Sequence, residues 1–137
     1  MKTYVLDACA LVAFFNYEEG ADIVEDLLCK ANNGECVVAM NKYNFLEVYY
    51  GYLRTNGEFH AETVFNAVED MNIEIYDILT NEILREAGKL KVAHKISLAD
   101  SVALAQAAVN NAAIVTSDHH EFDIVERETD IDFVWIR

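Results

Sequence analysis

Two aspartates in this 137-residue chain stand where short apolar segments end, a position from which a carboxylate can do chemistry. Asp7 directly follows the apolar segment 3–6, and Asp118 follows the segment 113–116, which ends at Thr116. An aspartate at such a junction either caps the next helix by accepting from its free N–H groups or projects its carboxylate into a ligand site. The sequence leaves both roles open.

Two further acidic residues lie in helical segments whose other residues are mostly apolar or aromatic. Glu47 lies among the aromatic side chains of residues 43–50, and Asp100 lies among the small and apolar side chains of residues 96–103. Asp100 also fits a capping box with Ser97, which would hold its carboxylate in the first turn of a helix. A capping role does not exclude a ligand role, so both interpretations stay open.

The four carboxylates together indicate a metal site. Carboxylates within about 4–6 Å of one another cannot all stay ionised without raised pKa values, and a divalent cation removes that conflict. Oxygen ligands with no Cys/His pair nearby favour Mg²⁺ or Mn²⁺ over zinc. Such ions activate water and bridge the phosphate in phosphodiester hydrolysis. The acids therefore predict metal-dependent hydrolysis, provided that the fold gathers them.

Short apolar segments alternate with longer helical segments, and this alternation predicts an α/β fold. The expected strands are residues 3–6, 36–39, 73–76 (an edge strand), 113–116 and 132–136. The expected helices are residues 8–17, 21–31, 43–54, 58–71, 81–93, 98–110 and 121–127. We expect one domain over residues 1–137, a three-layer α/β/α sandwich around a parallel sheet of four to five strands. Asp7 and Asp118 would share one crevice if their strands are neighbours.

The chain is strongly acidic, with 24 acidic and 10 basic residues and a formal net charge of −14. This charge repels nucleic acid, so a role on nucleic acid requires bound cations or a local basic patch. Four basic residues lie close together in the sequence: Arg85, Lys89, Lys91 and Lys95. They form either such a patch or an ordinary solvated helix face.

The composition excludes two classes of protein. Apolar residues make up 53% of the chain, which excludes intrinsic disorder. The longest apolar stretch, residues 6–15, is about half of the roughly 20 residues that a membrane span needs. Cys9, Cys29 and Cys36 form no CxxC pair, so we expect buried free thiols. No signal peptide is recognisable, and these features together predict a cytoplasmic protein.

Four segments around these acids resemble the motifs of one known family. They are Val5-Leu6-Asp7-Ala8-Cys9-Ala10-Leu11, Asn44-Phe45-Leu46-Glu47-Val48, Ile96-Ser97-Leu98-Ala99-Asp100-Ser101-Val102-Ala103-Leu104-Ala105 and Ile114-Val115-Thr116-Ser117-Asp118-His119. In order and spacing they resemble the PIN domain, and most of all the VapC-type toxins of prokaryotic toxin–antitoxin pairs. The resemblance implies the same α/β/α sandwich and a metal-dependent endoribonuclease that takes RNA as substrate and Mg²⁺ or Mn²⁺ as cofactor.

The resemblance also implies roles for individual residues. The family's acidic tetrad corresponds to Asp7, Glu47, Asp100 and Asp118, and its supporting hydroxyl corresponds to Thr116. Asp123 is a further candidate ligand, with a turn or capping role as the alternative. Cys9 stands where the family often has Ser or Thr. The family's toxins usually form homodimers and are silenced by a small antitoxin whose tail enters the acidic groove, often with a basic side chain.

Two other functions stay open. One is an RNA-processing PIN nuclease with no antitoxin, and the other is a PIN-like binding module without catalysis. The presence of all four carboxylates argues against the binding module, because such a module has no chemical need for them. The aromatic side chains of Tyr43, Tyr49, Tyr50 and Tyr52 could stack RNA bases, but core packing or a dimer interface is the favoured interpretation.

Overall fold

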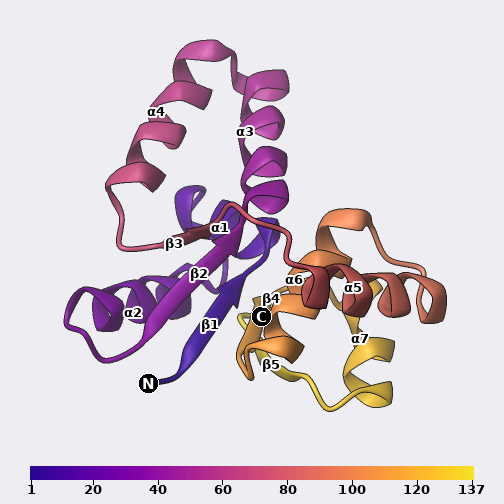
Figure 1. Ribbon diagram of the computed structural model, residues 1–137. Helices are drawn as coiled ribbons and strands as arrows, with labels where there is room; N and C mark the ends of the chain where they lie inside the picture. The colour runs from indigo at the N-terminus through magenta and orange to yellow at the C-terminus, as the bar shows by residue number, and fades with distance from the viewer.

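A five-stranded parallel sheet with helices on both faces forms the protein, as described by a computed structural model of residues 1–137 (Figure 1). The strands are β1 (Thr3–Leu6), β2 (Val37–Asn41), β3 (Glu74–Tyr76), β4 (Ala113–Thr116) and β5 (Asp132–Trp135). The helices are α1 (Ala8–Phe15), α2 (Ala21–Asn32), α3 (Lys42–Asn56), α4 (Glu58–Asp70), α5 (Asn81–Ala93), α6 (Leu98–Val109) and α7 (His119–Glu128). The predicted α/β class and parallel sheet are confirmed.

The strand order of the sheet is β3-β2-β1-β4-β5, and every neighbouring pair is parallel. The chain moves outward from β1 through β2 to β3, which lies at the predicted edge, and then returns to add β4 and β5 on the other side. The order therefore reverses between β1 and β4, and the carboxyl ends of these two strands form the switch point where ligands bind in open α/β sheets. Asp7 and Asp118 follow these two strands, as the sequence predicted.

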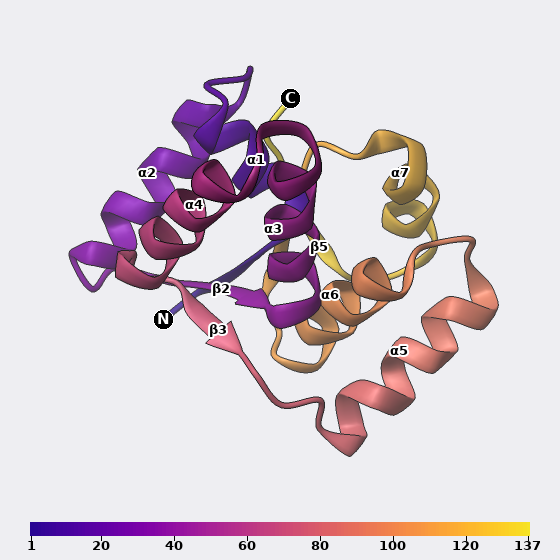
Figure 2. The same ribbon diagram turned by 90° about the horizontal axis from the view of Figure 1, so that it is seen from above.

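Alternating side chains of the central strands point into two separate cores. Leu6 and Val115 pack with α1, α2, α3 and α4, whereas Val5 and Ile114 pack with α5, α6 and α7. Figure 2 shows these two groups of helices on opposite sides of the sheet. Because both faces are covered, both alternating sets of side chains are apolar, which explains the continuous apolar segments of the sequence. No helix combines the length and the apolar character that crossing a bilayer would require.

The largest difference from the predicted elements lies between the second strand and the third helix. The sequence indicated a strand at 36–39 and a helix at 43–54, whereas β2 runs to Asn41 and α3 starts at Lys42. Asn41 both ends the strand and caps the helix, because its Oδ1 accepts from the Asn44 N–H at 2.7 Å. A side-chain cap of this kind removes the need for a loop.

The prediction that all three cysteines are buried is wrong for two of them. Cys36 is buried, but Cys29 lies on the solvent side of α2 and Cys9 lies exposed in the first turn of α1. Cys9 lies two residues after Asp7, near the carboxyl end of β1. All three thiols are free.

Candidate functional site

Asp7 is buried at the junction between β1 and α1. Only 1% of its surface is exposed. Its Oδ1 accepts from the Ala10 N–H at 2.9 Å, so Asp7 caps α1, and its own N–H donates to the Val115 carbonyl of the neighbouring strand. These bonds fix the carboxylate at the switch point of the sheet.

Thr116 connects Asp7 to Asp118. It is the last residue of β4 and is fully buried. Its hydroxyl donates to Asp7 Oδ2 at 2.5 Å and accepts from the Asp118 N–H at 3.0 Å. Asp118 in turn caps α7, since its Oδ1 accepts from the Glu121 N–H at 3.1 Å. One buried hydroxyl therefore sets the relative position of the two acidic residues that follow β1 and β4.

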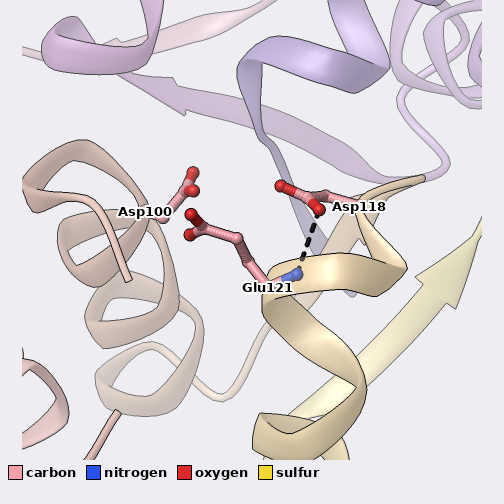
Figure 3. Close-up of side chains that lie close together, drawn as sticks. All are labelled: Asp100, Asp118 and Glu121. Carbon is pink, nitrogen blue, oxygen red and sulfur yellow. Dashed lines mark hydrogen bonds between the residues drawn. The ribbon is translucent and has the colours of Figure 1, made fainter. Parts of the chain in front are cut away.

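Asp100, Asp118 and Glu121 bring their carboxylates together (Figure 3). One oxygen from each of the three side chains lies within 4.8 Å of the others, and all three side chains are partly buried. Ser97 caps α6 by accepting from the Asp100 N–H at 3.1 Å, so Asp100 lies in the first turn, as its capping-box pattern indicated. Asp7 and Glu47 are outside this close trio, and their role as ligands remains a prediction.

Glu121 was not among the candidate residues from the sequence. Its side chain extends from α7 toward Asp100 on α6 (Figure 3), and its Oε2 accepts from the Ser97 N–H at 3.4 Å. One local signal could have found it. Asp118 and Glu121 have the spacing of a helix cap and its third residue, the same spacing that drew attention to Ser97 and Asp100.

Glu47 approaches the site from α3. It is half-buried, and its Oε1 accepts from Asn44 Nδ2 at 3.3 Å. Burial raises the pKa of Glu47, and the nearby charge of Glu121 raises it further. Glu47 therefore shares the electrostatic environment of the carboxylates on α6 and α7, although it comes from the other side of the sheet.

Burial first, and the charges of neighbouring carboxylates second, disfavour the ionised forms of the acids in the site. Burial, together with the charges of Asp118 and Glu47, raises the pKa of Asp7 from 3.8 to about 7. Burial, the charge of Asp7 and a hydrogen bond with Glu121 raise the pKa of Asp100 to about 8. No lysine, arginine or histidine is among the groups that shift the pKa of Asp7, Glu47 or Asp100. None of these three carboxylates forms an ion pair with a lysine, arginine or histidine.

This donor set fits a hard divalent cation. All the close donors are carboxylate oxygens, the ligands that Mg²⁺ and Mn²⁺ prefer. The one thiol nearby is a poor competitor, because desolvation and the charges of the carboxylates, Asp7 first, raise the pKa of Cys9 to about 12. A thiol binds metals as the thiolate, so this raised pKa favours the oxygen donors over Cys9 as ligands.

The remaining candidates from the sequence lie away from the carboxylate trio or serve other contacts. Asp123 is exposed on α7, where its Oδ1 lies 2.7 Å from His119 Nδ1. Tyr52 is buried in the core, as the favoured interpretation of the aromatic residues expected, whereas Tyr43 and Tyr50 are exposed. The basic residues Arg85, Lys89, Lys91 and Lys95 are all exposed on or just after α5.

The chain belongs to the PIN domain family. The family model matches residues 4–128, which include β1 from its second residue, β2 to β4, all seven helices and every acidic residue of the site. A comparison with curated protein sequences finds no match.

Solved structures with this fold include the toxin chains of several toxin–antitoxin complexes. The DNA-bound VapBC of Salmonella typhimurium gives a TM-score of 0.73 at 16% identity, covering 100% of both chains. VapBC2 of Rickettsia felis, bound to a promoter DNA fragment, gives 0.74 at 17% identity, covering 96% of this chain and 97% of the other. The sarcin–ricin-loop-cleaving toxin VapC20 of Mycobacterium tuberculosis gives 0.57 at 15% identity, covering 82% and 86%. At these identities the likeness establishes the shared fold.

Replacing Thr116 by valine tests the connection between the two acids. The change keeps the shape but removes the hydroxyl that serves Asp7 and Asp118, and it leaves the partly buried N–H of Asp118 without this acceptor. We expect a loss of about 1–3 kcal/mol in the free energy of unfolding, measured by urea denaturation. Thr63→Val on the exposed face of α4 is the matched control. An equal effect of the two substitutions would contradict the role given to Thr116.

The raised pKa of Asp7 predicts how stability changes with pH in metal-free protein. The folded state holds the Asp7 proton up to about pH 7, whereas the unfolded chain releases it near pH 3.8. The unfolded state therefore binds fewer protons in between, and the free energy of unfolding falls as pH rises from about 4 to 7. Urea denaturation should show a smaller fall in the free energy of unfolding over this pH range for Asp7→Asn than for the unsubstituted protein.

Added Mn²⁺ should raise the melting temperature more at pH 8 than at pH 5, because the carboxylates bind a cation in their ionised form. Equal increases at the two pH values would contradict the assignment of Asp7 to the metal site.

Proposed function

We propose that this protein is a Mg²⁺- or Mn²⁺-dependent endoribonuclease that hydrolyses phosphodiester bonds in RNA. The observation that carries the proposal is the group of carboxylates gathered beside the carboxyl ends of β1 and β4: Asp100, Asp118 and Glu121 lie close together, and the pKa values of Asp7 and Asp100 are raised. Membership in the PIN domain family and the fold shared with VapC20, a sarcin–ricin-loop-cleaving toxin, support it.

In this proposal the metal is held by the acids of the site. They are Asp7, Glu47, Asp100, Asp118 and Glu121. When bound, the metal activates water and neutralises the phosphate. The protein's own contribution is orientation: the Ala10 N–H and Thr116 hydroxyl hold Asp7, and the Glu121 N–H holds Asp118. These carboxylates repel a phosphate, so RNA can approach the site only when a cation is bound there.

We further propose that the protein is the toxin of a toxin–antitoxin pair. The structural neighbours from Salmonella typhimurium and Rickettsia felis are VapBC proteins, and a third neighbour is a toxin–antitoxin complex from Klebsiella pneumoniae. The antitoxin in this proposal is a small protein with a basic side chain that enters the acidic site. The alternatives, an RNA-processing nuclease without an antitoxin and a binding module without activity, differ in measurable ways.

A homodimer is also part of the proposal. Tyr43, Leu46, Tyr50 and Leu53 lie 3–4 residues apart on α3 and are each more than 40% exposed, so they form one apolar stripe. The stripe borders a groove of about 580 Å³ whose wall includes Leu46, Tyr49, Phe65, Ile78 and Leu79. A second copy of the chain would cover these apolar side chains, which a monomer would leave in water.

Cleavage of RNA by the purified protein tests the activity. We expect cleavage of mixed cellular RNA with Mn²⁺ or Mg²⁺ and none with EDTA. Asp100→Asn should lower the rate by more than ~100-fold, beyond the loss typical for a residue that only supports a ligand. Asp130→Asn, an exposed change in the turn before β5, is the control and should cleave normally. A folded protein that neither cleaves RNA nor binds Mn²⁺ would favour the binding module. Growth arrest on expression of this protein, relieved by co-expression of a small protein encoded by a neighbouring gene, would distinguish a toxin from an RNA-processing nuclease.

The oligomeric state tests the apolar stripe. Light scattering should give twice the chain mass for the protein and the mass of one chain for Leu46→Asp, because the substitution places a charge in the proposed interface. Val92→Asp, at another exposed apolar position, on α5, should leave the dimer intact. A monomeric unsubstituted protein would refute the homodimer.

A further inference from the structure

Two asparagines, Asn41 and Asn44, are buried behind Glu47. Asn44 has none of its surface exposed and Asn41 has 1%. A primary amide in such a place lowers stability unless its oxygen and N–H groups find partners. Both side chains have partners, and every one of those partners is in or beside the candidate site.

The direction of this hydrogen-bond chain is fixed by a backbone group. The Asn44 N–H can only donate, so the Asn41 atom 2.7 Å away is the carbonyl oxygen Oδ1. Asn41 Nδ2 then donates to Asn44 Oδ1 at 2.8 Å. The remaining Asn44 Nδ2 donates to Glu47 Oε1 at 3.3 Å. The oxygen and nitrogen atoms of an asparagine amide have nearly the same shape, so they are assigned from the hydrogen bonds that they make. Here the network assigns both amides.

The same network reaches the helix that carries Asp100. Asn41 Nδ2 also lies 3.5 Å from the carbonyl oxygen of Ala99, the residue before Asp100 in α6. Asn41 therefore contacts α3 through Asn44 and α6 through Ala99. Glu47 and Asp100 come from these two helices, and the amides are a polar connection between them.

Helix capping accounts for only part of this arrangement. The cap of α3 needs the Asn41 Oδ1 and the Asn44 N–H, and it does not need an amide on the side chain of residue 44. An apolar side chain would suit a fully buried position on a helix better than an amide. The Asn44 amide is explained if Glu47 must be held in one orientation, with one oxygen accepting a hydrogen bond and the other facing the site.

We propose that Asn44, itself held by Asn41, is a positioning residue that orients Glu47 for metal binding. The inference rests on the proposed function, because it requires Glu47 to take part in holding the metal. Residues that support a metal ligand in this way typically contribute about 10- to 100-fold to metal affinity.

A double-mutant cycle on Mn²⁺ affinity tests the proposal without relying on RNA cleavage. Isothermal titration calorimetry would compare the unsubstituted protein with Asn44→Leu, Glu47→Gln and the double variant. Leucine matches asparagine in shape, so the change removes the hydrogen bonds but not the packing. We expect Asn44→Leu to weaken Mn²⁺ binding about tenfold or more in the unsubstituted background and to have no further effect when Glu47 is already glutamine.

The outcomes separate this proposal from the proposed function. An equal weakening in both backgrounds would show that Asn44 acts by general structure and would overturn the positioning role. If the unsubstituted protein binds no Mn²⁺, the proposed function fails first and the positioning role fails with it. Asn72→Leu, which removes an amide bonded to Ala31 outside the site, should leave Mn²⁺ affinity unchanged.

A second variant covers the case in which Asn44→Leu does not fold. Asn41→Ser keeps a side-chain oxygen that can cap α3 but removes the N–H groups that hold the Asn44 amide. We expect weaker Mn²⁺ binding that again depends on Glu47. Unchanged affinity in Asn41→Ser would contradict the proposal.

Discussion

Repulsion between carboxylates is the constraint on which the rest of the site depends. The parallel sheet brings the ends of β1 and β4 side by side, and the two acidic residues that follow these strands meet there. Burial disfavours the ionised forms of Asp7 and Asp100, and neighbouring carboxylates add to this effect, so the pKa values of these two residues rise to about 7 and about 8. Buried carboxylates that lie close together, with no basic side chain paired to them, all stay ionised only when a cation binds among them.

The helix termini reduce this repulsion and position the acids at the same time. Asp7 and Asp118 cap α1 and α7, and Asp100 lies in the first turn of α6. The N–H groups and the positive end of the helix dipole favour a negative charge at each of these places. Capping and metal binding were alternatives in the sequence, but the geometry makes them compatible, since a capping carboxylate keeps lone pairs free for another partner.

The sequence predicted those parts of the protein that depend on local pattern. Apolar segments indicated the strands, and acids at their ends indicated Asp7 and Asp118. The spacing of Asp118 and Glu121 indicates a helix cap, but it does not indicate that Glu121 reaches Asp100. That contact depends on how α7 packs beside α6, which no local sequence pattern predicts. Asn41 was missed for a related reason: a strand that passes into a helix without a loop looks like two separate elements joined by a linker.

The net charge of −14 is easier to understand once the site is in place. A strongly negative net charge attracts cations toward the protein and repels RNA. The exposed basic residues on and just after α5, Arg85 and Lys95 among them, are few beside the 24 acids. The proposed metal and the basic side chain of the proposed antitoxin would therefore bind the same carboxylates for the same electrostatic reason, so inhibition by that side chain would require no second site.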